Sequence, residues 1–166
     1  MLVLICGLPG TGKSTLANAL AREIGATVLR TDEIRKKLFE EPRYSEEEKE
    51  LVYRVIFLIA EHLLRNRCNV IIDGTFYKRA LRQQVYEIAE KTNSSIEVVE
   101  CVTPEYLIKR RMEGGRKKRA LSDADYEIYK KIRDEFEPIE RKHIVIDTSR
   151  HREQSLEQLL SELRAV

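Results

Sequence analysis

The sequence predicts a single α/β domain in which a five-stranded parallel sheet is covered by helices on both faces. Short apolar runs alternate along the chain with segments of helical periodicity, the pattern that parallel strands joined by crossover helices produce. A glycine-rich loop also follows the first apolar run and leads directly into a helical pattern. The length of 166 residues suits one hydrophobic core, so we expect one domain over residues 1–166.

The predicted strands are short runs rich in Val, Ile and Leu. They are Leu2–Cys6, Thr27–Leu29, Val70–Ile72, Ile96–Val102 and His143–Ile146. The helical patterns between them cover about 13–24, 33–39, 45–66, 78–91, 104–113, 122–137 and 152–164. Ser45 and Glu48 have the spacing of a capping box and predict the start of the third helix. Ligands of such sheets bind beyond the carboxyl ends of the strands, where we therefore expect the functional residues.

The loop after the first strand matches the pattern G-x-x-x-x-G-K-[ST]. Such a loop turns backbone N–H groups toward an anion and is followed by a helix N-terminus, so it predicts a phosphate-binding site. We expect Lys13 to reach the β and γ phosphates of ATP, and the Ser14 hydroxyl to join the shell of a Mg²⁺ ion. The predicted nucleotide-binding residues of the loop are Gly7, Leu8, Pro9, Gly10, Thr11, Gly12, Lys13, Ser14 and Thr15.

The second strand leads into Asp32, and Arg35 follows one helical turn later on the same side. A carboxylate at this edge of the sheet can accept the proton of an incoming hydroxyl group. A guanidinium beside it can hold that substrate or a nearby phosphate. The alternative is that Asp32 or Thr31 only caps the following helix.

The third strand runs into Asp73-Gly74. An acid directly after this strand lies close to the phosphate loop, where it can orient metal-bound water or accept a hydrogen bond from the loop serine. Asp73 and Ser14 are therefore the predicted residues on the metal side. An Asp-Gly hairpin turn is the alternative, but the pattern from Tyr77 to Glu90 is helical.

Basic residues are concentrated between positions 109 and 119, where seven of eleven residues are Lys or Arg. Gly114 and Gly115 divide the segment and predict a joint with little backbone restriction. We expect a hinged lid, about residues 109–121, that closes over a triphosphate and neutralises charge on the transferred group. A solvated helix end and a patch that binds nucleic acid are the alternatives.

Several other features limit the class of protein. The formal net charge is only +2, so the basic segment is a local feature. Cys6, Cys68 and Cys101 lack metal-ligand spacing and predict reduced core thiols. The first strand begins at the N-terminus and no apolar stretch approaches the length of a membrane span. We therefore expect a cytoplasmic protein without a signal peptide.

Two segments near the C-terminus complete the predictions. The fifth strand runs into Asp147, near the expected position of the nucleotide base, where this residue could instead cap the last helix. Tyr126 and Tyr129 have helical spacing, which favours a place in the core or in the wall of the cleft over a platform for stacking bases.

Together these motifs resemble those of the small P-loop kinases related to polynucleotide 5′-hydroxyl kinases, zeta-toxin-like kinases and chloramphenicol phosphotransferase. The likeness covers nearly the whole chain, and its segments are Gly-Leu-Pro-Gly-Thr-Gly-Lys-Ser-Thr, Thr-Asp-Glu-Ile-Arg, Ile-Ile-Asp-Gly-Thr-Phe, Leu-Ser-Asp-Ala-Asp-Tyr and Val-Ile-Asp-Thr. It implies a P-loop NTPase fold like that of nucleoside-monophosphate kinases: a three-layer sandwich with strand order 2-3-1-4-5 and a mobile lid.

The resemblance also implies roles for individual residues. Asp32 matches the base that accepts the acceptor proton, and Arg35 matches the arginine that orients the acceptor. Lid arginines of this group contact phosphate and adenine. In this sequence the candidates for these contacts are Arg110, Arg111 and Arg116, and the pattern does not fix which arginine makes which contact. We predict Arg116 as a catalytic residue and Arg110 and Arg111 as nucleotide-binding residues.

The expected activity is transfer of the γ-phosphoryl group of ATP to a hydroxyl group, with Mg²⁺. The favoured acceptor is a nucleic-acid 5′-hydroxyl, on the strength of the family likeness and the basic segment. The alternatives are a small-molecule hydroxyl (antibiotic, sugar or nucleoside), an aminoacyl-tRNA hydroxyl, and, from a different class, a nucleotide-dependent binding or switch module. A nucleoside monophosphate is less expected, because an ionised phosphate needs no base such as Asp32.

Overall fold

The computed structural model of the chain describes residues 1–114 and 123–165. Five strands within these residues form one parallel sheet in the order β2-β3-β1-β4-β5, which confirms the predicted α/β fold and strand order. The strands are β1 (Leu2–Cys6), β2 (Ala26–Arg30), β3 (Asn69–Asp73), β4 (Ile96–Val102) and β5 (Ile144–Asp147).

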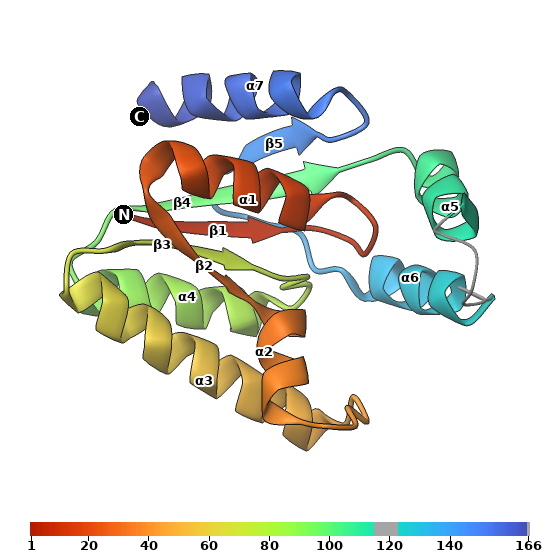
Figure 1. Cartoon of the computed structure of the whole chain (residues 1–166), viewed down its shortest axis with the longest axis horizontal. Coiled ribbons are helices and arrows are strands. Elements are labelled where there is room, and N and C mark those ends of the chain that lie inside the picture. Colours follow the sequence, from red (N-terminus) through yellow and green to blue (C-terminus); the bar gives the residue numbers. More distant parts are fainter. Residues whose placement is uncertain (115–122, 166) are drawn as a thin grey trace.

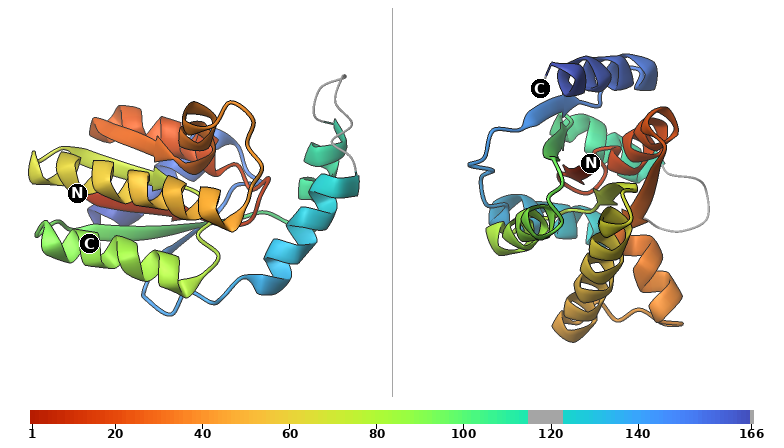
Figure 2. Two further views of the ribbon diagram at one scale, coloured as in Figure 1. Left: turned by 90° about the horizontal axis from the view of Figure 1, so that it is seen from below. Right: turned by 90° about the vertical axis from the view of Figure 1, so that its left-hand side faces the viewer.

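Helices cover both faces of the sheet, so the molecule has the expected three layers (Figure 1). α1 and α7 lie on one face, and α3 and α4 lie on the other. α2 follows β2 directly, while α5 and α6 lie beyond the carboxyl ends of the strands (Figure 2). The helices are α1 (Lys13–Ile24), α2 (Thr31–Leu38), α3 (Glu46–Arg65), α4 (Arg79–Lys91), α5 (Glu105–Gly114), α6 (Asp123–Glu135) and α7 (Arg152–Arg164).

The central strand β1 has no solvent exposure, because its side chains enter the cores on both sides of the sheet. Leu2 and Leu4 pack with the apolar side chains of α3 and α4, whereas Val3 and Ile5 pack with those of α1 and α7. A strand buried on both faces reads as a continuous apolar run, which is the pattern that marked this strand in the sequence. No helix of the described residues is both long and apolar enough to cross a membrane.

Two of the three cysteines are core residues, as predicted, and the third is not. Burial raises the pKa of Cys6 and of Cys101 to about 12, so both thiols stay protonated at neutral pH. Cys68 is exposed in the turn between α3 and β3, which corrects the expectation of a core position. All three are free thiols.

The turn after β3 is closely packed against the start of α2. Asp73 is the last residue of β3, and α4 follows it, so the Asp-Gly pair does not form a hairpin. A Cβ atom on Gly74 would lie 2.8 Å from Cγ2 of Thr31 and 2.9 Å from the ring of Phe76. The junction therefore requires glycine, because the side chain of Thr31 at the start of α2 leaves no room for a Cβ atom.

The start of α3 confirms one half of the predicted capping box. The Ser45 hydroxyl accepts a hydrogen bond from the Glu48 amide at 3.2 Å. The Glu48 carboxylate does not return to the Ser45 amide, however. It accepts hydrogen bonds from the amides of Arg43 and Tyr44 instead, at 2.9 Å and 2.7 Å. The cap therefore fixes the preceding loop as well as the helix.

The helices α5 and α6 pack against each other through an ionic and aromatic contact. Glu105 accepts hydrogen bonds from the hydroxyl of Tyr126 at 2.5 Å and from Arg133 at 3.0 Å. Tyr126 stacks on Tyr129, which is buried, as the sequence predicted for a core or wall residue. Residues 115–122, which contain most of the predicted lid and Arg116, lie outside the described part of the chain.

Arg82 joins the segment after α6 to the segment after β3. Its side chain is 1% exposed, and it donates to the carbonyl oxygens of Phe76, Glu137 and Pro138 at 2.7, 2.8 and 2.9 Å. A buried guanidinium is stable only when its donors are satisfied in this way. The α5–α6 unit is therefore anchored to the start of α4.

We predict that Gly74→Ala lowers the free energy of unfolding by about 1–3 kcal/mol, because the added methyl group overpacks the Thr31–Phe76 contact. Denaturant unfolding of the purified protein measures this change. In the Gly74→Ala background, Thr31→Ser removes the clashing methyl group and should recover part of the loss. A double variant as unstable as the sum of its single variants would contradict this contact.

Candidate active site

The phosphate loop runs from the buried end of β1 into α1. Three of its glycines have positive φ angles, 139° at Gly7, 80° at Gly10 and 77° at Gly12. Gly7 is the most constrained, since a Cβ atom there would lie 2.4 Å from the carbonyl oxygen of Cys101. The first turn of α1 carries no acidic residue, so the positive end of the helix dipole remains free for an anion.

Lys13 lies inside this loop with its ammonium group 2.8 Å from the carbonyl oxygen of Leu8. Its partial removal from water lowers its pKa, while the carboxylates of Asp73 and Asp32 raise it. A phosphate would give the ammonium a charged partner in place of the neutral carbonyl.

Asp73 connects the phosphate loop to the end of β2. Its Oδ2 atom accepts a hydrogen bond from the Ser14 hydroxyl at 2.7 Å and another from Nε of Arg30 at 2.8 Å. Arg30 also donates to the side chain of Asn18 on α1 at 2.9 Å. The Asp73 side chain is only 2% exposed, so Arg30 compensates a charge that would otherwise be costly to bury.

Ser14 and Asp73 fit a magnesium site. The described residues contain no group of three or more His, Cys, Asp and Glu side chains that could hold a metal ion. Mg²⁺ is usually held by one or two protein oxygens together with substrate phosphates and waters, so two residues suffice. Because Asp73 is already paired with Arg30, it suits a hydrogen bond to metal-bound water, with Ser14 as the direct ligand.

Asp32 and Arg35 lie on the first two turns of α2, which directly follows β2 at the carboxyl edge of the sheet. The Asp32 side chain is 74% exposed and that of Arg35 only 10%, and their charged atoms approach to 3.8 Å. Arg30 occupies the N-cap position of α2, and no side chain bonds to the cap. The capping alternative for Asp32 and Thr31 is therefore wrong, and the Asp32 carboxylate is free to face a substrate.

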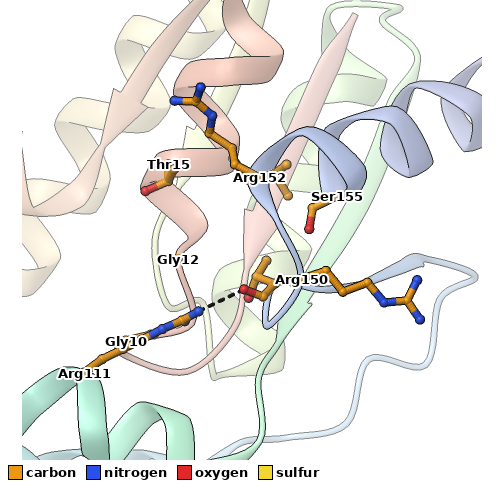
Figure 3. Close-up of a pocket in the computed structure, with 9 residues that line it drawn as sticks. Gly10, Gly12, Thr15, Arg111, Arg150, Arg152 and Ser155 are labelled. Atoms are coloured by element: carbon orange, nitrogen blue, oxygen red, sulfur yellow. Dashed lines mark hydrogen bonds between the residues drawn. The ribbon is translucent and has the colours of Figure 1, made fainter.

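A cavity of about 480 Å³ lies beside the loop on the side of β5 (Figure 3). Arg111 of α5 spans its entrance, donating to the carbonyl oxygens of Gly10 at 3.0 Å and Thr148 at 2.9 Å. Arg152 at the start of α7 and Thr15 at the start of α1 both line this cavity. The nucleotide base was predicted to lie in this region, near the end of the fifth strand.

The loop after β5 is held by side chains rather than by a helix cap. The Thr148 hydroxyl contacts that of Thr103 at 2.6 Å and donates to the carbonyl oxygen of Thr11. Asp147 does not cap α7, because its carboxylate accepts the Ser149 amide at 2.8 Å. Hydrogen bonding by the side chain of Ser149, and then by its amide, lowers the pKa of Asp147. The wall of the cavity and the phosphate loop are thus directly connected.

The structure brings Lys13, Ser14, Asp32 and Asp73 together at the carboxyl edge, as their order after the strands predicted. Arg111 contacts the phosphate loop, whereas Arg110 is exposed. The predicted catalytic Arg116 lies outside the described residues.

Sequence reasoning missed the contacts of two residues, Arg30 with Asp73 and Thr148 with the phosphate loop. The signal for Arg30 was present, since it and Asp73 are register partners at the ends of neighbouring strands. The contacts of Thr148 bridge positions more than one hundred residues apart and leave no local pattern.

Known sequences include relatives of this chain. A family model described as an AAA domain matches residues 2–139. A probable adenylyl-sulfate kinase of Archaeoglobus fulgidus is 30% identical over 157 residues, which cover 89% of this chain and 95% of that protein. The L-seryl-tRNA(Sec) kinase of Methanococcus maripaludis is 29% identical over 123 residues, 70% of this chain and 47% of that protein.

An uncharacterized protein of Mycobacterium tuberculosis is 36% identical over 112 residues, 60% of this chain. The match spans only 22% of that longer protein.

Solved structures show the same architecture. The Mycobacterium tuberculosis APS kinase in complex with AMPPNP and APS superimposes with a TM-score of 0.72 at 18% identity, covering 98% of this chain and 96% of that one. A gluconokinase from Sinorhizobium meliloti gives a TM-score of 0.73 at 18% identity, covering 98% and 91%. The chain therefore belongs to the AAA domain family and has the fold of the P-loop kinases.

Proposed function

We propose that the chain is a phosphotransferase that moves the γ-phosphoryl group of ATP to a hydroxyl group of an acceptor. The position of Asp32 carries the proposal. Its carboxylate is exposed, it does not cap α2, and it lies on the helix that directly follows β2 at the carboxyl edge of the sheet, the edge that also carries the phosphate loop. A nucleotide-dependent switch would not need a free carboxylate beside the phosphates, whereas transfer to a hydroxyl needs a base there.

The reaction assigns one task to each residue. Asp32 accepts the proton of the acceptor hydroxyl as its oxygen forms a bond to the γ phosphorus, and the bond from that phosphorus to the β–γ bridging oxygen breaks to leave ADP. Lys13 and the amides of the loop stabilise negative charge on the phosphoryl oxygens. Ser14 and Asp73 would hold Mg²⁺, which supplies further charge neutralisation when it is bound.

The named relatives favour a small-molecule or tRNA hydroxyl as acceptor. By their names, these relatives act on adenylyl sulfate and on seryl-tRNA, and one structural neighbour is a gluconokinase. The nucleic-acid 5′-hydroxyl expected from the basic segment remains a prediction, since that segment lies partly outside the described residues. A transfer screen with radiolabelled ATP over small alcohols, aminoacyl-tRNA and 5′-hydroxyl oligonucleotides tests all three classes. Absence of transfer to every class would contradict the proposal.

We predict that Lys13→Ala lowers turnover by about a hundredfold or more, because the ammonium stabilises charge that develops on the transferred group. ADP formation with the best acceptor of the screen measures the effect. Lys91→Ala, an exposed change at the end of α4, is the matched control and should keep full activity. Normal ATP consumption by a folded Lys13→Ala variant would remove Lys13 from the site.

We also predict that Asp32→Asn and Asp73→Asn fail in different ways. Asp32→Asn should abolish transfer but leave the affinity for Mg-ATP within a fewfold range, since it removes only the base. Asp73→Asn should raise the Mg²⁺ concentration needed for half-maximal activity, because it alters the carboxylate beside Ser14. Magnesium titrations of activity and calorimetric ATP binding separate the two. Equal loss of ATP binding in both variants would show that Asp32 serves the nucleotide rather than the acceptor.

A further inference from the structure

The hydroxyl of Thr148 holds one carbonyl group of the phosphate loop. Among the residues that the structure describes, it is the only group that donates a hydrogen bond to the carbonyl oxygen of Thr11, a residue that is 1% exposed. The Val102 carbonyl also lies 3.1 Å from this hydroxyl, but it already accepts the Thr148 amide at 3.0 Å. A buried carbonyl without a donor is unfavourable. The phosphate loop therefore depends on this hydroxyl more than the neighbouring strand does.

Thr103 supports the Thr148 hydroxyl in turn. The two hydroxyl oxygens lie 2.6 Å apart. A carbonyl can only accept, so the Thr148 proton is committed to the loop and Thr103 must donate to Thr148. Arg111 of α5 can only donate, and its Nη1 atom lies 3.5 Å from the Thr103 oxygen. A chain of hydrogen bonds thus runs in one direction from α5 to the loop, and each bond in such a chain strengthens the next.

A fixed Thr11 carbonyl also fixes the amide that follows it. The peptide bond between Thr11 and Gly12 is trans, so its N–H points away from its carbonyl and hence away from Thr148. This Gly12 amide has no backbone acceptor within the described residues. Free amides of a glycine-rich loop form the concave surface that binds an anion. The Thr148 side chain also lies against Gly12, where an added Cβ atom would be 3.7 Å from its own Cβ.

We propose that Thr148 is a positioning residue that holds the phosphate loop in its anion-binding shape, with Thr103 as its support. The identity of the anion as the triphosphate of ATP rests on the proposed function, whereas the positioning rests on the hydrogen bonds alone. A loop that already has its bound shape does not have to be ordered when the ligand arrives. Without the hydroxyl, the binding-competent shape is populated less and the apparent affinity falls by the same fraction.

Calorimetric binding of AMPPNP and Mg²⁺ to the full chain tests the proposal. Thr148→Val keeps the shape of the side chain but removes the hydroxyl, and should weaken binding about tenfold, as expected for one lost hydrogen bond. Thr148→Ser keeps the hydroxyl and should restore the affinity close to that of the wild type. Thr103→Val should weaken binding by a smaller but measurable factor, because Thr11 keeps its donor.

Two comparisons separate positioning of the loop from other roles of Thr148. Tripolyphosphate lacks a base, so it should lose affinity for Thr148→Val by the same factor as AMPPNP if the hydroxyl acts on the loop. Thr92→Val is the matched control. The Thr92 hydroxyl donates to the Ile88 carbonyl at 2.8 Å at the end of α4, so this variant also loses a threonine hydrogen bond but should keep both affinities.

The proposal is overturned if a folded Thr148→Val variant binds AMPPNP as the wild type does, or if tripolyphosphate does not share the loss. Should Thr148→Val not fold, unchanged AMPPNP affinity in Thr103→Val would overturn it as well.

Transfer kinetics separate this proposal from the proposed function. Thr148→Val should raise KM for ATP by about the factor that it costs AMPPNP, while kcat changes little, because bound phosphates hold the loop themselves. A loss of AMPPNP affinity in the variant, with no transfer by the wild type, would leave the positioning role in place and remove the phosphotransferase. Transfer by a Thr148→Val variant with wild-type affinity and KM would do the reverse.

Discussion

The buried carboxylate of Asp73 is the point on which the arrangement of the site depends. It lies at the end of β3 between two neighbours, the hydroxyl of Ser14 on α1 and the guanidinium of Arg30 on β2. A buried carboxylate is tolerated only where such partners compensate its charge. The three elements are therefore held together at one spot, and the nucleotide side of the site cannot move independently of β2.

This connection extends to the acceptor side through the backbone. Arg30 ends β2 and Thr31 begins α2 without an intervening loop, so Asp32 and Arg35 are carried on a helix attached rigidly to the strand that Arg30 ties to Asp73. In phosphoryl transfer most of the rate enhancement comes from placing the two reactants and stabilising charge between them. A direct strand-to-helix junction gives that placement with few rotatable bonds between acceptor base and phosphate loop.

Much of this could be predicted from sequence, because the relevant signals were local. Buried parallel strands read as apolar runs, and the carboxyl ends of neighbouring strands meet at one edge, so the places of Ser14, Asp32 and Asp73 followed. The strand order was implied by the resemblance to the P-loop kinases. Contacts between distant segments did not follow. The stacking of Tyr44 on Arg35 depends on a left-handed loop conformation, and Glu48, which seemed to complete a capping box, bonds to the loop instead. The caps suggested for Asp32 and Asp147 failed because the helices begin at other residues.

The three carbonyl contacts of Arg82 have a mechanical consequence. They join the backbone after α6 to the backbone after β3. The C-terminal end of the α5–α6 unit, which we call the arm, is therefore fixed to the turn that follows Asp73. At its other end the arm contacts the phosphate loop through the exposed side chain of Arg111 and through Ile108 and Met112, whose side chains lie against Gly10. One end of the arm is thus fixed by the buried Arg82, and the other end is held by contacts with the phosphate loop. Separating α5 from the loop would therefore require breaking the hydrogen bond of Arg111 to Gly10 and the apolar packing on Gly10, whereas moving the other end would require unpairing a buried cation.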